Sequence, residues 1–367
     1  MGEATATAAD YSTMPSLAAV ATVDFPYKVD QQVVKQHAKG LFAPSFPHVE
    51  RMMSVFDNTE IQARNFCKPL QYYSTLHSFQ EQNAEYIRLS LEYSVKAIEE
   101  CLAAARIAKD EITDIIVIST TGLATPSLDA LIVNEMKLHR NICRTPVFGL
   151  GCAGGVAGFA KASVVAIANP DAVVLLVAVE LCSLTFLRND YSKSNFIGSS
   201  LFADGVAACI ITGHNRANRT NNAIRFLGAQ STLYYDTLDV MGWEFIDGGF
   251  KVLFSQDIPA MISTHIYDDV FSFLAKHHLT LSEMKNLIFH PGGKKVLTAY
   301  EEALAVGRDR LKNTREVMND NGNMSSATVL YVLERFLSRG FDNGHGLMLS
   351  MGPGFSSEMV LLHMNKR

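Results

Sequence analysis

The fold is decided by the segment Gly149-Leu-Gly-Cys152-Ala-Gly-Gly-Val-Ala-Gly158. It follows the short stretch Pro146-Val-Phe-Gly149, which predicts a strand, and it opens a run of small residues that predicts a helix over residues 153–168. Because glycine and alanine carry little or no side chain, such a helix can pack tightly in the centre of a protein. The segment therefore predicts a strand, a turn that carries a cysteine, and a central helix.

Strands and helices alternate on both sides of this segment. The first half of the chain predicts helices over 31–42, 47–56, 79–108 and 128–138, and strands over 114–119, 172–179 and 206–212. The second half repeats the order, with a strand over 286–289, helices from Lys294 and from Ser325, and strands over 346–350 and 357–363. Such alternation is typical of α/β folds with largely parallel central strands, and the repetition indicates an internal duplication.

The repetition divides the chain into two halves. Residues 1–16 are rich in Ala, Thr and Ser without an apolar period, so they predict a loose tail. Residues 215–222 are polar and also lack apolar periodicity, so the boundary between the halves is expected there. We therefore expect an N-terminal half over 17–214, which carries Cys152, and a C-terminal half over 223–367, which carries His290 and Asn323.

The composition of the 367-residue chain narrows the function classes. The net charge is −5 and no stripe of Lys and Arg stands out, so nucleic acid is not an expected partner. None of the six cysteines forms a CxxC pair and no Cys/His cluster has zinc spacing, so we expect no metal site. No apolar window is expected to span a bilayer, and the N-terminus lacks the features of a signal peptide. These observations predict a cytoplasmic protein with reduced thiols.

Cys152 is a candidate nucleophile because of its neighbours. It lies at the mouth of a predicted helix, whose N-terminal amides and macrodipole favour a thiolate. The small residues around it leave room for a substrate and let backbone N–H groups approach. The alternative interpretation is a buried structural cysteine, which is common for an isolated cysteine.

Two further polar residues begin predicted helices. His290 ends a strand in Phe289-His-Pro-Gly-Gly-Lys294, where it could pair with a thiolate or bind a substrate carbonyl; its alternative is a helix cap or a core histidine. Asn323 lies in Gly322-Asn-Met-Ser-Ser-Ala327, where its amide could donate to an oxyanion; its alternative is plain N-capping. We interpret Cys152, His290 and Asn323 as one nucleophilic set at equivalent strand-to-helix junctions.

Nearly all of the chain after residue 16 resembles the type III polyketide synthases, the chalcone synthase family of the thiolase-fold superfamily. The GCAGG cysteine, the HPGG histidine and the GNMSSA asparagine match the family's catalytic triad in identity and order. Phe202, in the segment GSSLFADG over 198–205, matches the phenylalanine beside that triad. The resemblance implies a duplicated αβαβα layered α/β fold of the thiolase type.

The segment Ser350-Met-Gly-Pro-Gly354 resembles the family's GFGPG loop, with Ser350 and Met351 in place of Gly and Phe. The retained Gly352, Pro353 and Gly354 are expected to keep the scaffold of the cyclisation pocket.

Two segments, over 180–186 and 241–252, are similar to bacterial members, including those that make alkylpyrones from long fatty acyl-CoA. Val252 stands where plant enzymes have a bulky Phe, Thr125 where they have a Met that reaches across the dimer, and Cys182 where they have a pocket Thr. Together with Thr185, these residues are expected to bind substrate. The smaller side chains at 125 and 252 predict a longer or wider starter tunnel; the alternative is an ordinary change of core packing.

The resemblance implies a sequence of chemical steps. Cys152 takes the acyl group from an acyl-CoA, with His290 as the imidazolium partner of its thiolate. His290 and Asn323 then donate to the thioester carbonyl of malonyl-CoA, and Phe202 favours loss of its carboxylate as CO2.

The resemblance further implies iterative condensation to alkylpyrone-type products, in a homodimer that is expected to need no metal or tightly bound cofactor. The alternatives are a resorcinol-forming synthase, a single-condensation ketoacyl synthase, and an inactive thiolase-fold scaffold.

Overall fold

The computed structural model describes residues 11–43, 49–216, 222–255 and 257–366. Its framework is a nine-stranded mixed sheet in the order β11-β12-β13-β8-β1-β7-β6-β4-β5. These strands are β1 (Ser16–Thr22), β4 (Asp114–Ile118), β5 (Cys143–Val147), β6 (Val173–Leu181), β7 (Asp204–Thr212), β8 (Asn222–Leu233), β11 (Met284–Phe289), β12 (Gly344–Gly352) and β13 (Ser356–Lys366).

The sheet repeats one topology twice. In the first half, β4 and β6 are parallel, and β6–β7 and β7–β1 are antiparallel. In the second half, β11 and β12 are parallel, and β12–β13 and β13–β8 are antiparallel. The halves meet where β1 pairs with β8, through only two residue pairs at Ser16 and Leu17. The expected duplication is therefore confirmed by strand order.

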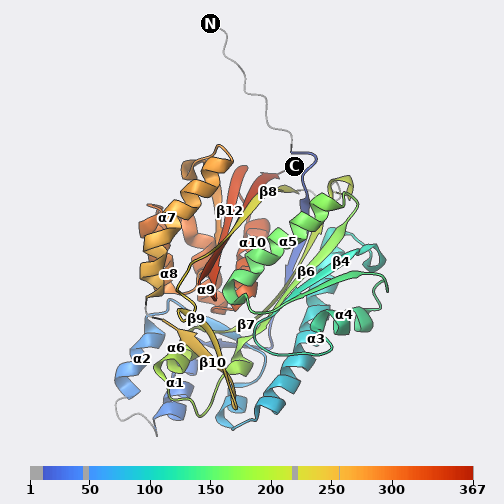
Figure 1. Cartoon of the computed structure of the whole chain (residues 1–367). Coiled ribbons are helices and arrows are strands. Elements are labelled where there is room, and N and C mark those ends of the chain that lie inside the picture. The colour runs from blue at the N-terminus through green and yellow to red at the C-terminus, as the bar shows by residue number, and fades with distance from the viewer. Residues whose placement is uncertain (1–10, 44–48, 217–221, 256, 367) are drawn as a thin grey trace.

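Helices form three layers around the two half-sheets (Figure 1). The central layer is α5 (Gly154–Ala168) and α10 (Thr328–Arg339). One outer layer is α3 (Phe79–Ala105) and α4 (Leu128–Met136), and the other contains α7 (Ile258–Lys276) and α8 (Lys294–Ala303). A further helix, α9 (Lys312–Asn321), packs against α10. The layers alternate as α, β, α, β, α, which confirms the predicted thiolase-like class.

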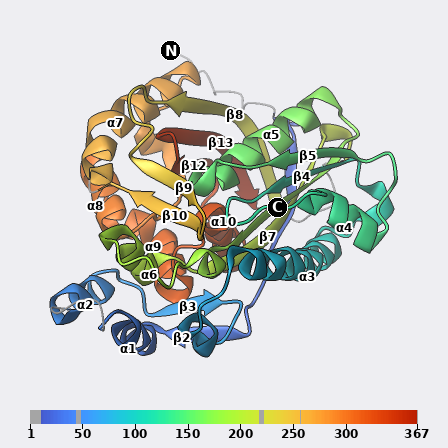
Figure 2. The same cartoon turned by 60° about the horizontal axis from the view of Figure 1, so that its bottom comes forward.

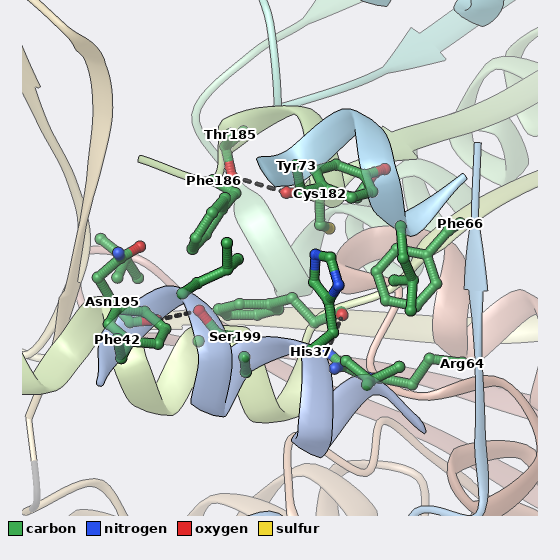
Figure 3. A pocket seen from close by; sticks show the side chains of 18 of the residues that line it. His37, Phe42, Arg64, Phe66, Tyr73, Cys182, Thr185, Phe186, Asn195 and Ser199 are labelled. Carbon is green, nitrogen blue, oxygen red and sulfur yellow. Dashed lines mark hydrogen bonds between the residues drawn. The ribbon is translucent and has the colours of Figure 1, made fainter. Parts of the chain in front are cut away.

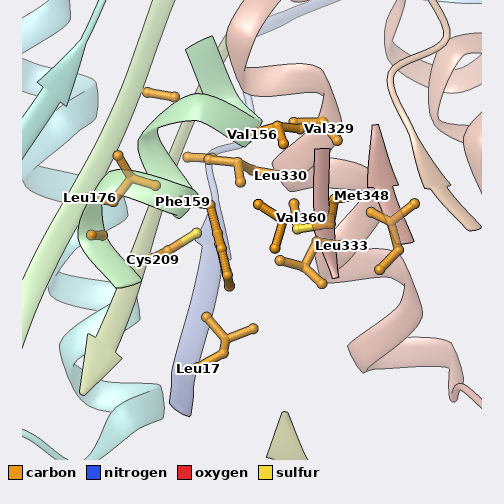
Figure 4. Packing of buried hydrophobic residues seen from close by; sticks show 14 of the residues in the cluster. Leu17, Val156, Phe159, Leu176, Cys209, Val329, Leu330, Leu333, Met348 and Val360 are labelled. Atoms are coloured by element: carbon orange, nitrogen blue, oxygen red, sulfur yellow. The ribbon is translucent and has the colours of Figure 1, made fainter. Parts of the chain in front are cut away.

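The central core explains why α5 consists of small residues. Val156 and Phe159 of α5 pack in one apolar cluster with Leu330 and Leu333 of α10 and Val360 of β13, as Figure 4 shows. A Cβ at Gly155 would lie 2.3 Å from the carbonyl oxygen of Ser326. Glycine is therefore required where the two central helices approach each other, since any side chain would overlap the facing backbone.

A smaller unit covers one end of the layers, at the bottom of Figure 1 and nearer the viewer in Figure 2. It contains the two-stranded sheet of β2 (Tyr27–Asp30) and β3 (Ala63–Phe66), and the hairpin of β9 (Met241–Ile246) and β10 (Gly249–Phe254). Its helices are α1 (Gln31–Phe42), α2 (Val49–Asp57) and α6 (Lys193–Leu201). An apolar cluster that includes Phe42, Phe56 and Phe196 joins its helices. This unit provides most of the wall of the cavity described below.

Several sequence predictions differ from the structure. Most of the expected tail lies outside the described residues, and its last residue, Ser16, already belongs to the central strand β1. The expected boundary over 215–222 lies mostly outside the described residues as well. The sequence interpretation did not include β8, α6, α7, α9 or the β9–β10 hairpin, which the structure contains. β5 begins at Cys143, earlier than expected, and is exposed at the edge of the sheet.

One apolar stretch does have the length and mean hydropathy of a membrane span, contrary to the sequence expectation. It is residues 151–168, with a mean hydropathy of 1.5. However, 61% of this stretch is buried inside the fold, since it forms the turn before α5 and α5 itself. Its apolar character therefore reflects its place in the central core.

Candidate functional site

Cys152 lies in a single 3-10 turn, Gly151–Ala153, directly before α5. A Cβ at Gly352 would lie 2.5 Å from the carbonyl oxygen of Leu150 and 2.6 Å from the Cβ of Ala153. A Cβ at Gly151 would lie 2.7 Å from the ring of Pro353. The Gly352-Pro353-Gly354 loop and the cysteine turn thus pack so closely that neither Gly151 nor Gly352 could carry a side chain. The loop supports the turn, and its three residues do not line the cavity described below.

The Cys152 thiol is buried, with 8% of the residue exposed. Its Sγ donates to Ser325 Oγ over 3.7 Å. Burial raises the pKa of the Cys152 thiol to about 12, although the hydrogen bond to Ser325 opposes the shift. Burial therefore favours the protonated thiol in this state, against the thiolate that the sequence leads one to expect.

His290 follows β11 immediately and is 2% exposed. Its backbone N–H donates to the Leu349 carbonyl over 2.8 Å, which fixes it to β12. Neither ring nitrogen has a hydrogen-bond partner within the described part of the chain. Burial lowers the pKa of His290 to about 3, so the ring is neutral. A neutral imidazole has one free donor and one free acceptor at the site.

Asn323 lies between α9 and α10, and so it does not follow a strand as the sequence interpretation supposed. Instead, its backbone forms a parallel bridge with Phe202. Its side-chain Nδ2 donates to the Gly292 carbonyl over 2.8 Å, and its Oδ1 accepts from the Ser325 N–H over 2.9 Å. The second contact caps the turn that starts α10, so the capping role left open by the sequence is real.

These contacts join the three predicted residues. Cys152 contacts Ser325, Ser325 contacts Asn323, and Asn323 contacts Gly292 in the turn after His290. No hydrogen bond links Cys152 to His290 among the residues described, so the expected thiolate–imidazolium pair is absent from this state. The arrangement offers a thiol, a neutral imidazole and an amide, which is a set suited to acyl transfer.

A buried carboxylate that the sequence interpretation did not single out lies beside this set. Glu180 is fully buried at the end of β6; its carboxylate accepts from Thr120 N–H over 3.1 Å, from Thr121 Oγ1 over 3.0 Å and from Ser326 Oγ over 2.5 Å. Burial raises the pKa of Glu180 to about 7, with its hydrogen bonds opposing the shift. An acidic residue that ends an otherwise apolar strand was the available sequence signal.

A cavity is lined by Phe202, by side chains of the β9–β10 hairpin and by residues of α1, β3 and α6, and Figure 3 shows part of its wall. Phe202 lies in the cavity wall and its backbone forms the bridge with Asn323, so Phe202 connects the cavity with the site around Cys152, His290 and Asn323. Cys182, Thr185 and Val252, which the sequence predicts to bind substrate, also lie in its wall. Thr125 does not; it is exposed on the loop before α4.

The cavity wall is mainly apolar, with Val34, Leu41, Phe66, Leu70, Phe186 and Trp243 among its residues. Most of its polar side chains form hydrogen bonds within the protein. Thr185 Oγ1 donates to the Cys182 carbonyl over 2.8 Å, and Ser199 Oγ donates to the Asn195 carbonyl over 2.7 Å. Tyr73 OH donates to Ser183 Oγ over 2.6 Å. The surface presented to a ligand is therefore more apolar than the residue types suggest.

Comparisons with known proteins agree with this geometry. Residues 61–215 match the family model of the N-terminal domain of chalcone and stilbene synthases, and residues 227–365 match that of the C-terminal domain. A putative chalcone synthase of Bacillus subtilis is 40% identical over 93% of this chain and 96% of its own length.

A 1,3,6,8-tetrahydroxynaphthalene synthase of Streptomyces peucetius is 35% identical over 95% of this chain and 92% of its own. The crystal structure of the Streptomyces coelicolor 1,3,6,8-tetrahydroxynaphthalene synthase superposes with a TM-score of 0.90 at 25% identity, over 96% of this chain and all of the other.

Proposed function

The chain belongs to the chalcone and stilbene synthase family and is a type III polyketide synthase, and we propose that its starter is a long-chain fatty acyl-CoA that it converts into an alkylpyrone. As such an enzyme it is an acyltransferase that forms carbon–carbon bonds by decarboxylating condensation. The proposed starter class rests on one observation, the apolar cavity that Phe202 lines. Most polar groups in its wall form hydrogen bonds within the protein.

Acyl loading requires that Cys152 lose its proton. In the proposed step, the neutral His290 ring accepts the proton of Sγ while the sulfur attacks the thioester carbonyl of the acyl-CoA. The new C–S bond replaces the C–S bond to CoA, and the imidazolium returns the proton to the leaving CoA sulfur. Before substrate binds, burial favours the neutral pair, because it raises the pKa of Cys152 and lowers the pKa of His290.

Extension uses the same donors. The His290 N–H and the Asn323 amide donate to the thioester carbonyl of malonyl-CoA, and loss of CO2 leaves an enolate on that oxygen. Phe202 offers an apolar face that disfavours the malonyl carboxylate relative to CO2. The enolate carbon then attacks the acyl group on Cys152 and expels its sulfur, which completes one extension. The enzyme is proposed to act without a metal or a tightly bound cofactor, since CoA itself is the carrier.

Several relatives are named for aromatic products, including tetrahydroxynaphthalene and phloroglucinol. An aliphatic starter suits this chain better, because each methylene transferred from water to an apolar wall contributes about 0.8 kcal/mol. The small side chains of Cys182, Thr185 and Val252 in that wall support the same conclusion. Pyrone closure is proposed on the resemblance to bacterial alkylpyrone synthases.

Product analysis by mass spectrometry tests this proposal. The purified enzyme is supplied with malonyl-CoA and with saturated acyl-CoA starters of graded length, from acetyl to stearoyl, and Cys152→Ala is the control without a nucleophile. The proposal predicts that kcat/KM rises with chain length and that alkylpyrones dominate. Use of malonyl-CoA alone, with no incorporation of longer starters, would contradict the starter class. Resorcinols in place of pyrones would contradict only the mode of ring closure.

We further propose that the protein is a cytoplasmic homodimer. All six cysteines are free thiols, as expected in a reducing compartment. Leu123 and Phe148, on the loops beside Thr125 and β5, are 43% and 48% exposed, and β5 leaves an open sheet edge. Such a surface suits a second copy of the chain. Light scattering after size exclusion tests this, and a monomer at micromolar concentration would contradict it.

A further inference from the structure

Arg64 is a buried cation in the cavity wall to which the mechanism above assigns no role. It lies on β3 and is 1% exposed, and Figure 3 shows it beside His37 at one side of the cavity. Its Nη1 donates to the Phe202 carbonyl over 2.8 Å. Its Cγ lies 2.8 Å from the position that a Cβ would take at Gly322, so a side chain at 322 would displace it. Arg64 is therefore held next to both Phe202 and the segment that carries Asn323.

The guanidinium also lies over the Phe66 ring, 5.2 Å from its centroid, but this contact does not use its N–H donors. Nε and Nη2 are buried and have no hydrogen-bond partner among the described residues. Leaving such donors unpaired inside a protein costs on the order of 1–3 kcal/mol, or more for charged groups. Burial lowers the pKa of Arg64 to about 9, because the charged guanidinium has lost its contact with water.

Asp204 is the carboxylate that acts electrostatically on Arg64, but it already accepts hydrogen bonds from other groups. It accepts from the Cys67 N–H over 2.6 Å, from the Ser183 N–H over 2.8 Å and from Ser183 Oγ over 2.6 Å. Asp204 acts on Arg64 electrostatically and leaves its remaining donors without a partner. A ligand for these donors therefore needs an acceptor atom but no negative charge of its own.

The other polar wall residues do not compete for this role. Tyr73, Thr185, Asn195 and Ser199 donate to protein oxygens, and His37 contacts Ser74 Oγ over 3.2 Å. Arg64 is the one wall residue, within the described part of the chain, that has buried nitrogen atoms without a partner. An aliphatic starter has no hydrogen-bond acceptor beyond its thioester, so its chain cannot accept from Nε or Nη2 of Arg64.

We propose that Arg64 binds a ketone oxygen of the growing β-ketoacyl chain and thereby retains the extended intermediate for its next condensation. The inference rests on the proposed function, because each extension adds one neutral carbonyl oxygen of the required kind. Arg64 then distinguishes an extended chain from an unextended starter of equal length. No bond is made or broken at Arg64; its N–H groups donate to the ketone or to its enolate.

The test compares two thioester primers that differ by one oxygen. These are the N-acetylcysteamine thioesters of a saturated fatty acid and of the corresponding 3-oxo acid, each extended with malonyl-CoA. The variant is Arg64→Lys, which keeps a positive charge and one donor for Phe202 but lacks the planar fork. The matched control is Arg188→Lys, because Arg188 also has a buried, unpartnered Nε but lines a neighbouring hollow outside the cavity.

Wild type is expected to prefer the 3-oxo primer, by kcat/KM, and Arg64→Lys is expected to reduce that preference by about tenfold, the value of one charged hydrogen bond. Arg188→Lys should keep the wild-type preference. An unchanged preference in Arg64→Lys, or an equal fall for both primers, would overturn the inference and leave Arg64 as a support for Phe202. If wild type extends neither primer, the proposed function itself fails, so the two failures are distinguishable.

Discussion

Replacing Val252 by Phe tests whether the cavity lined by Phe202 and Val252 holds the starter chain. Val252 lies on β10, and its Cγ1 is 3.7 Å from the position of a Cβ at Gly198. The Phe202 ring lies 3.3 Å from the same point. Both side chains therefore border one narrow part of the cavity, where a phenyl ring at 252 would take the place of part of the acyl chain.

The expected effect follows from the lost apolar contact. A phenyl ring extends beyond the valine methyl groups by roughly the length of two methylenes, and each methylene contributes about 0.8 kcal/mol. The selectivity for a long starter over a short one, measured as a ratio of kcat/KM values, should therefore fall by about 15-fold. Activity with short starters should persist, since Cys152, His290 and Asn323 lie outside the cavity wall.

The assay is a set of competition reactions in which acyl-CoA starters of graded length share limiting enzyme, with products quantified by mass spectrometry. Leu253→Phe is the matched control, because neighbouring residues of a strand point to opposite faces and Leu253 is not part of the cavity wall. A chain-length profile that Val252→Phe leaves unchanged would refute the assignment of this cavity to the starter. An equal shift in Leu253→Phe would attribute the effect to the hairpin as a whole.

Three further predictions concern the site itself. Cys152→Ala should abolish acyl loading, seen as the absence of an acyl adduct in intact-protein mass spectrometry, yet leave slow malonyl-CoA decarboxylation, because the His290 and Asn323 donors remain; loss of both in a folded variant would contradict this. Gly352→Ala should lower stability by about 1–3 kcal/mol in urea unfolding, because its Cβ would meet the Leu150 carbonyl oxygen at 2.5 Å, whereas Gly307→Ala, with no atom within 4 Å of its Cβ, should have little effect. His290 has a folded pKa of about 3 against 6.5 for the free residue, so its contribution is complete above pH 6.5 and is lost as the pH falls toward 3, by on the order of 5 kcal/mol. The slope of stability against pH over this range should therefore be smaller in His290→Gln, and identical slopes would show that the folded pKa is not depressed.

The sequence predicted the local features of the fold well where a pattern extends over neighbouring residues. The helix over 31–42 was predicted at its observed bounds, and α3 was predicted to begin at Phe79, where Ser78 and Glu81 form a capping box. β1 and β8 were missed, although they join the two halves at the centre of the sheet. Their residues alternate weakly, and only pairing with strands far along the chain identifies them.

The candidate site was predictable in part for a similar reason. Glycine-rich turns drew attention to Cys152, His290 and Asn323, because the residues that form a tight turn are neighbours in the sequence. Glu180 and Arg64 lie in no such turn. The apolar strand around Glu180 marks this acidic residue as unusual, but neither residue's own segment indicates what lies opposite it. Glu180 meets Ser326 across 146 positions of the chain, and Arg64 meets Phe202 across 138.

Sequence alone therefore determined the family, the duplicated α/β class and the identity of the thiol, imidazole and amide groups, because these depend on residue types and short spacings. Only the tertiary structure decided the protonation of Cys152 and His290, since both pKa shifts arise from burial by distant segments. It also decided which residues form the cavity wall: Val252 and Cys182 belong to it, whereas Thr125 and the Gly352-Pro353-Gly354 loop do not. The physical reason is that desolvation and enclosure depend on all the atoms around a group, and most of those atoms come from elsewhere in the chain.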